Sequence, residues 1–108
     1  MKSLLIILLI VLTFTFNPPA LAADTANGAT IFSAQCAGCH INGGNIVRRG
    51  KTLKKKALKR NGVDSLEAVA SLVANGKNNM PAYKDRLSAK EIEDVTAYVL
   101  EQAEKDWR

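Results

Sequence analysis

Cys36-Ala37-Gly38-Cys39-His40 is the stretch that decides how this chain of 108 residues folds. Its C-x-x-C-H spacing is that of a c-type haem attachment site. Two thiols at this separation reach the two vinyl groups of one porphyrin and form thioethers, and the next residue places an imidazole under the iron. The motif therefore predicts one haem c, attached covalently through Cys36 and Cys39, with His40 as an axial iron ligand.

Two other interpretations of the cysteine pair remain open. A thioredoxin-like redox pair requires a strand-helix-strand context, which the sequence does not show, and it leaves His40 without a role. A chance match would leave two free or paired thiols, and a disulfide across so small a loop would stabilise the fold little. The haem interpretation explains all three residues at once.

The second axial ligand is inferred from residue counts. His40 is the only histidine of the chain, so two histidines from one chain cannot hold the iron. Met80 is the only methionine besides Met1, and Pro81 separates it from the next helix. A thioether is a soft ligand that raises the reduction potential of a haem. We expect Met80 on the iron; the alternatives are core packing by Met80, a lysine ligand, or an open sixth position as in gas-binding or peroxidase-like proteins.

The first 22 residues have the pattern of an export signal. Lys2 precedes nine uninterrupted apolar residues at 4–12, and Ala20-Leu21-Ala22 fits an A-x-A cleavage site. An uncleaved membrane anchor is the alternative, but the apolar run of 13 residues at 4–16 is shorter than the ~20 residues of a spanning helix. The sequence predicts a signal peptide over 1–22, removed on export, and one domain over 23–108.

Helical periodicity and the lack of strand alternation predict an all-α domain. Four helices are expected, at about 25–39, 53–60, 65–74 and 88–105. The predicted caps are Asp24 or Thr25, then Thr52, then Asp64 paired with Glu67, and finally Ser88 paired with Glu91. Asn61-Gly62 and Asn75-Gly76 are expected to end the second and third helices. The apolar faces, including those of Phe32, Ile92, Val95 and Leu100, are expected to pack against the haem.

With these residues in place, the chain resembles the small class I cytochromes c, and within them the cytochrome c6 family. The resemblance covers nearly all of residues 23–108 and rests on the motif at 36–40, on Asn75-Gly76-Lys77-Asn78 leading to Met80-Pro81-Ala82-Tyr83, and on Ala97-Tyr98-Val99-Leu100. It implies about four helices around one covalently bound haem. The implied function is that of a monomeric one-electron carrier, not an enzyme, in the thylakoid lumen or periplasm.

The resemblance also implies partners. Members of the family take electrons from cytochrome f of the cytochrome b6f complex and pass them to photosystem I, and in cyanobacteria also to a terminal cytochrome oxidase. Arg86 matches the family's arginine beside the exposed haem edge, where photosystem I docks; an ion pair with a haem propionate is the alternative role. Leu72 stands where the family commonly has glutamine near the haem. An apolar residue there is typical of lower-potential relatives, which would serve a different lumenal or periplasmic partner.

Charge is distributed unevenly along the chain, whose net charge is +5. Residues 48–60 hold eight cations and no acid, whereas residues 85–108 hold seven acids and four bases. A solvated helical face is one interpretation of the basic stretch, and steering toward an acidic membrane partner is the other. Binding to nucleic acid is not expected, because the chain is predicted to be exported and the stretch has no interleaved aromatic residues.

Overall fold

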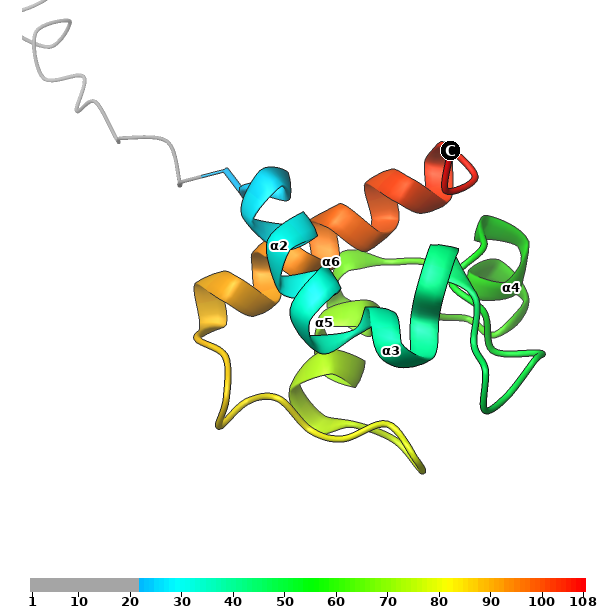
Figure 1. Ribbon diagram of the computed structural model, residues 1–108, viewed down its shortest axis with the longest axis horizontal. Coiled ribbons are helices and arrows are strands. Elements are labelled where there is room, and N and C mark those ends of the chain that lie inside the picture. The colour runs from blue at the N-terminus through cyan, green and yellow to red at the C-terminus, as the bar shows by residue number, and fades with distance from the viewer. Residues whose placement is uncertain (1–21) are drawn as a thin grey trace, which may run out of the picture.

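The computed structural model describes residues 22–108, so the predicted signal peptide at 1–22 lies almost wholly outside the described residues. The chain runs through α2 (Thr25–Gln35), α3 (Ala37–His40), the 3₁₀-helix η1 (Ile41–Gly43), α4 (Lys55–Arg60), α5 (Leu66–Asn75) and α6 (Ala89–Glu104) (Figure 1). No strand occurs between residues 22 and 108, where Lys77 and Met80 form an isolated antiparallel bridge. The all-α prediction is therefore confirmed.

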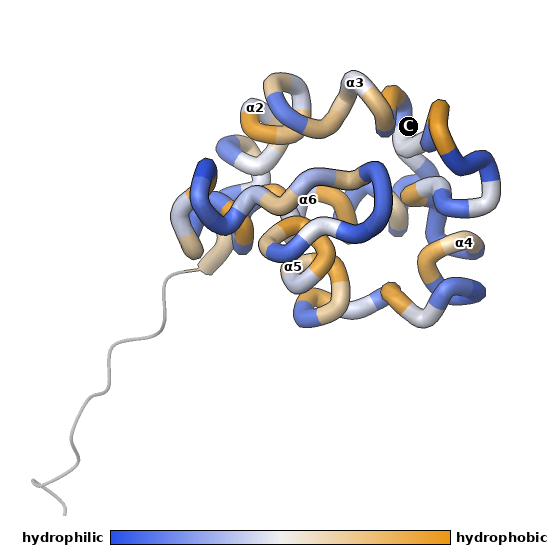
Figure 2. Tube along the Cα trace, turned by 90° about the horizontal axis from the view of Figure 1, so that it is seen from below, coloured by the Kyte–Doolittle hydropathy of each residue, from blue (hydrophilic) through white to orange (hydrophobic). Residues whose placement is uncertain are grey.

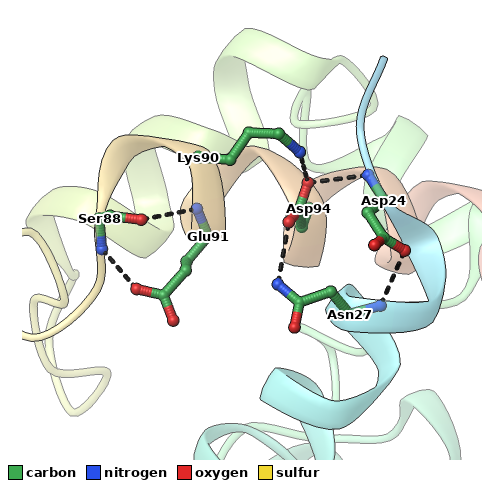
Figure 3. Close-up of polar contacts among 6 residues, drawn as sticks. All are labelled: Asp24, Asn27, Ser88, Lys90, Glu91 and Asp94. Atoms are coloured by element: carbon green, nitrogen blue, oxygen red, sulfur yellow. Dashed lines mark hydrogen bonds and ion pairs between the residues drawn. The ribbon is translucent and has the colours of Figure 1, made fainter. Parts of the chain in front are cut away.

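The pair formed by α2 and α6 is the scaffold on which the other segments pack (Figure 1). A glycine allows the close approach, since a Cβ on Gly28 would collide with the backbone carbonyl of Asp94. Asp94 is itself 2% exposed and accepts hydrogen bonds from the backbone N–H of Asp24 (2.8 Å), from Asn27 Nδ2 (2.9 Å) and from Lys90 Nζ (Figure 3). These bonds lower the pKa of Asp94 to about 2, and the bond from Lys90 has the largest effect.

An aromatic cluster joins the end of the chain to this scaffold. Phe32 lies 5.4 Å from Tyr98 and 5.2 Å from Trp107 between ring centroids. The Trp107 indole N–H donates to the carbonyl oxygen of Leu53 at 3.0 Å. Gly43 lies directly against the Trp107 ring, where no side chain would fit. The C-terminus therefore holds the segment before α4 in place.

The buried core lies between α2, α5 and α6. Figure 2 shows hydrophobic and hydrophilic residues alternating along α5 and α6, the pattern of helices with one buried face. The buried side chains there include Ile31, Val69, Val73, Val95 and Val99. None of the helices in residues 22–108 is long and apolar enough to cross a membrane.

Two predicted helix starts are wrong, and a third helix is broken. Leu53 lies outside α4: its N–H donates to the Gly43 carbonyl oxygen at 2.7 Å and its own carbonyl oxygen accepts from the Trp107 indole, and α4 begins at Lys55 without a cap from Thr52. Ser65, rather than Asp64, caps α5 by accepting from the Ala68 N–H. The first predicted helix is interrupted at Cys36, where the Cys36 carbonyl starts a new turn by accepting from the His40 N–H.

The other caps are confirmed. Asp24 accepts from the Asn27 N–H and begins α2. Ser88 and Glu91 form the reciprocal capping box of α6 (Figure 3). Gly76 ends α5 in a conformation that glycine favours, with φ +70° and ψ 177°.

Candidate haem site

One cavity is lined by residues from nearly every segment of the fold. The four predicted haem-binding side chains, Cys36, Cys39, His40 and Met80, all line it. Apolar side chains of α5 and α6 form much of the remaining wall: Val69, Leu72, Val73, Val95 and Val99. The sequence placed these groups between 36 and 99, and the fold brings them around one space.

The C-x-x-C-H motif lies on the turn from α2 into α3. Cys36 is half-buried and Cys39 is exposed, and both line the cavity. His40, at the end of α3, is held by a 2.8 Å hydrogen bond between its Nδ1 and the Gly44 carbonyl oxygen. Because a carbonyl oxygen can only accept, Nδ1 is the protonated nitrogen and Nε2 keeps its lone pair for a metal.

The Cys36 thiol lacks the electrostatics of the reactive cysteine in a redox pair. Burial raises the pKa of Cys36 to about 11, so this thiol is protonated at neutral pH. The reactive cysteine of a thioredoxin-like C-x-x-C motif instead has a lowered pKa, which makes the thiolate available. The surroundings of Cys36 therefore argue against the thiol-disulfide interpretation.

Met80 is carried by the loop at 76–87, whose first turn is tightly built. Lys77 and Met80 exchange backbone hydrogen bonds of 3.0 and 2.9 Å, and Asn78 between them has φ +53°. A Cβ on Gly76 would lie 2.5 Å from the Met80 carbonyl oxygen, so the loop folds back closely on the end of α5. The half-buried Met80 is thereby brought to the cavity.

Sequence reasoning missed Tyr83 in the same loop. Tyr83 is buried, lines the cavity, and donates from its hydroxyl to the Gln35 carbonyl oxygen at 3.0 Å. Its position three residues after Met80 was visible, but its partner is 48 residues away in the chain.

Arg86, the predicted docking residue, is exposed and lies over the Tyr83 ring, with 5.4 Å from its guanidinium carbon to the ring centroid. It makes no ion pair with any residue of 22–108.

Two of the four side chains expected to pack against the haem line the cavity. Phe32 and Val95 line the cavity, whereas Ile92 and Leu100 do not. Ile92 is buried in the core, and Leu100 faces a second groove beside Leu58. Successive residues of a helix point about 100° apart, so Val99 takes the position at the cavity that Leu100 was expected to have.

The donor set and the walls fit a haem c. Two thiols, one imidazole with a free Nε2 and one thioether surround a largely apolar space, which is the chemistry of thioether attachment and His/Met ligation. A bare metal site has no comparable support, because residues 22–108 contain no cluster of three or more His, Cys, Asp or Glu side chains.

Comparisons with known proteins agree with this geometry. The profile of the family described as "Cytochrome C oxidase, cbb3-type, subunit III" matches residues 23–99. The chain is 64% identical to a cytochrome c6-like protein of Nostoc sp. (strain PCC 7120 / SAG 25.82 / UTEX 2576) and 54% identical to a cytochrome c6 of the same strain; each alignment covers 98% of this chain and 96% of the relative. The crystal structure of cytochrome c6C from Synechococcus sp. PCC 7002 matches with a TM-score of 0.73 and 62% identity, covering 75% of this chain and 99% of that one.

A cavity that gathers two thiols, an imidazole and a thioether thus occurs in a chain whose relatives match over nearly their full length. The chain belongs to the cytochrome c6 family, and is accordingly a haem c electron carrier rather than an enzyme, with one covalently bound haem.

Proposed function

We propose that the chain carries single electrons from cytochrome f of the cytochrome b6f complex to photosystem I, and also to a terminal cytochrome oxidase. Cys36 and Cys39 tether the haem, and His40 and Met80 ligate its iron. The assignment of these four residues rests on the observation that all four side chains line one apolar cavity. The bound haem supplies an iron that exchanges one electron.

The protein's own residues make that exchange simple. The Gly44 carbonyl orients the His40 ring, and the tight turn at 77–80 presents Met80 at the cavity. With both side chains on the iron, electron exchange would require little rearrangement and oxygen would find no open position. The apolar walls exclude water, which favours the reduced state.

Docking is assigned to two cationic regions. In the basic stretch, Lys55 pairs with Glu104 at 2.9 Å and Lys54 with Asp106 at 3.9 Å. The other cations of 48–60 have no acidic partner among residues 22–108, which supports steering toward an acidic membrane complex. Exposed Arg86 is the proposed contact with photosystem I. Encounters of this kind use small and weak interfaces.

Export completes the proposal. Residues 1–22 act as a cleaved signal peptide, and residues 23–108 function as a monomer in the thylakoid lumen or periplasm. Labelling of the N-terminus of the purified protein tests the cleavage site. A mature chain that begins at Ala23 is expected, and a retained Met1 contradicts it.

A lower-potential carrier with a different partner is the second candidate, and Leu72 favours it. Leu72 lines the cavity in the position where the c6 pattern has glutamine. The 64% identity to a c6-like protein, against 54% to a c6 of the same strain, points in the same direction.

A redox titration of the purified holoprotein separates the two candidates. A midpoint close to that of cytochrome f supports transfer from b6f to photosystem I, whereas a clearly lower midpoint refutes that role and supports the second candidate. The oxidised spectrum tests the ligands in the same sample, because an iron–sulfur bond gives a weak far-red band. Its absence, together with rapid carbon monoxide binding by the reduced protein at neutral pH, would exclude Met80 as the ligand.

A further inference from the structure

The middle of the loop at 76–87 is bonded to α5 at two consecutive residues: the Lys84 N–H donates to the Ala74 carbonyl oxygen at 3.1 Å, and Tyr83 makes the other bond. Its backbone N–H donates to the Val73 carbonyl oxygen in α5 at 2.9 Å. Its own carbonyl oxygen accepts from the N–H groups of Arg86 (2.9 Å) and Leu87 (2.8 Å). The bond to Val73 attaches the middle of the loop to α5, and the other two form a turn within the loop.

The Tyr83 side chain reaches in a different direction, to α2. Its hydroxyl donates to the carbonyl oxygen of Gln35, the last residue of α2. The last carbonyls of a helix have no partner within the helix, so this oxygen needs a donor from elsewhere. Gln35 directly precedes Cys36, and the hydrogen bond therefore joins the two segments that carry the cavity's sulfur groups.

We propose that Tyr83 is a positioning residue of this site, whose hydroxyl ties the Met80 loop to the α2 end that leads into Cys36. Met80 and Cys36 lie 44 positions apart in the chain, and this hydrogen bond joins their segments directly. The ring fills a buried position between them, and Arg86 covers it from outside. The inference rests on the proposed ligation by Met80.

Tyr83→Phe tests the tie, because it removes the hydroxyl and keeps the ring. The loss of one hydrogen bond is expected to raise the population with a displaced Met80 loop about fivefold, equivalent to ~1 kcal/mol. Carbon monoxide binding to the reduced holoprotein, which requires displacement of Met80, is expected to accelerate by about the same factor. The far-red band of the oxidised protein is expected to disappear about 0.7 pH units lower than in wild type, if one proton accompanies displacement.

Two variants provide controls. Tyr98→Phe makes the same chemical change at an aromatic residue whose hydroxyl has no hydrogen-bond partner within 22–108, and it is expected to leave both readouts unchanged. Asp94→Asn weakens the α2–α6 contact without touching the loop, so it lowers global stability. Equal acceleration by Asp94→Asn would mean that carbon monoxide enters through general unfolding, and would overturn the proposal.

Hydrogen exchange distinguishes failure of the tie from failure of the ligand assignment. The Lys84 amide, bonded to the Ala74 carbonyl oxygen of α5 at 3.1 Å, reports loop opening without reference to the iron. If wild type lacks the far-red band but Tyr83→Phe speeds this exchange about fivefold, Met80 ligation fails and the tie stands. If exchange, carbon monoxide binding and the band are all as in wild type, the tie is refuted.

Discussion

Gly76→Ala is the change expected to disturb the Met80 loop most directly. Gly76 has φ +70° and ψ 177°, a region used almost only by glycine, and occupying it with alanine costs of order 1–3 kcal/mol. The added Cβ would also lie 2.5 Å from the Met80 carbonyl oxygen and 2.8 Å from the Ala82 nitrogen. Both atoms belong to backbone, so relief requires that the segment 80–82 move away from α5.

The size of the expected effect on Met80 follows from the free energy of this backbone strain. If moving the loop releases the strain, the ratio of displaced to bound Met80 rises by about the same free energy, which is roughly 5- to 150-fold. A pH titration of the far-red band of the oxidised holoprotein measures this ratio. The midpoint is expected to fall by about 0.7–2 pH units if one proton accompanies displacement.

Gly62→Ala is the matched control for backbone strain. Gly62 has φ +69°, but a Cβ there would meet no atom within 4 Å. It is expected to lower the stability of the fold by about 1–2 kcal/mol and leave the far-red midpoint unchanged. A wild-type midpoint in Gly76→Ala, or an equal fall in both variants, would refute the argument that contact at 80–82 transmits the strain.

Three further results are expected. Asp94 has a folded pKa of about 2 against 3.8 in the unfolded chain, so its stabilising effect is present above about pH 4 and is lost as the pH falls toward 2. Unfolding followed by circular dichroism should therefore find Asp94→Asn less stable than wild type at pH 7. The difference in stability should be gone near pH 2. Gly43→Ala should displace the Trp107 ring, lower the melting temperature and shift the tryptophan fluorescence; an unchanged spectrum would contradict the contact. Lys56→Glu should slow reduction of the protein by cytochrome f and weaken the salt dependence of that rate, while leaving the midpoint potential unchanged. Lys55→Gln is the control and should change the rate less, because the Lys55 cation already pairs with Glu104.

The sequence predicted helix ends well where the residues that determine them lie within a few positions of each other. The Ser88 capping box and the Gly76 helix end are decided by neighbours in sequence, and both are confirmed. The start of α4 was mispredicted because the bonds made by Leu53 are not local: they join it to Gly43, ten residues earlier, and to Trp107, 54 residues later. Helix periodicity contains no information about such a bond.

The candidate site shows the same difference between features set by neighbouring residues and features set by distant ones. The C-x-x-C-H motif predicted three site residues from five consecutive positions, counting methionines predicted Met80, and all four side chains line the cavity. Tyr83 was missed because its role depends on a carbonyl 48 residues away, and any backbone carbonyl could have been its partner. Leu100 was misassigned because a helical face known only to within one residue does not tell which of two neighbours meets the cavity.

The two sides of the cavity are held by different kinds of structure, and this has a consequence for function. His40 lies beside the cysteines on a short helix and is held by Gly44, four residues away. Met80 instead depends on the loop at 76–87, which is fixed by the strain-sensitive turn at Gly76, by backbone bonds from Tyr83 and Lys84 to α5 and by the side-chain bond of Tyr83. Because the folded scaffold of α2 and α6 does not rely on that loop, changes in it should alter the sixth ligand and the reduction potential while the fold persists.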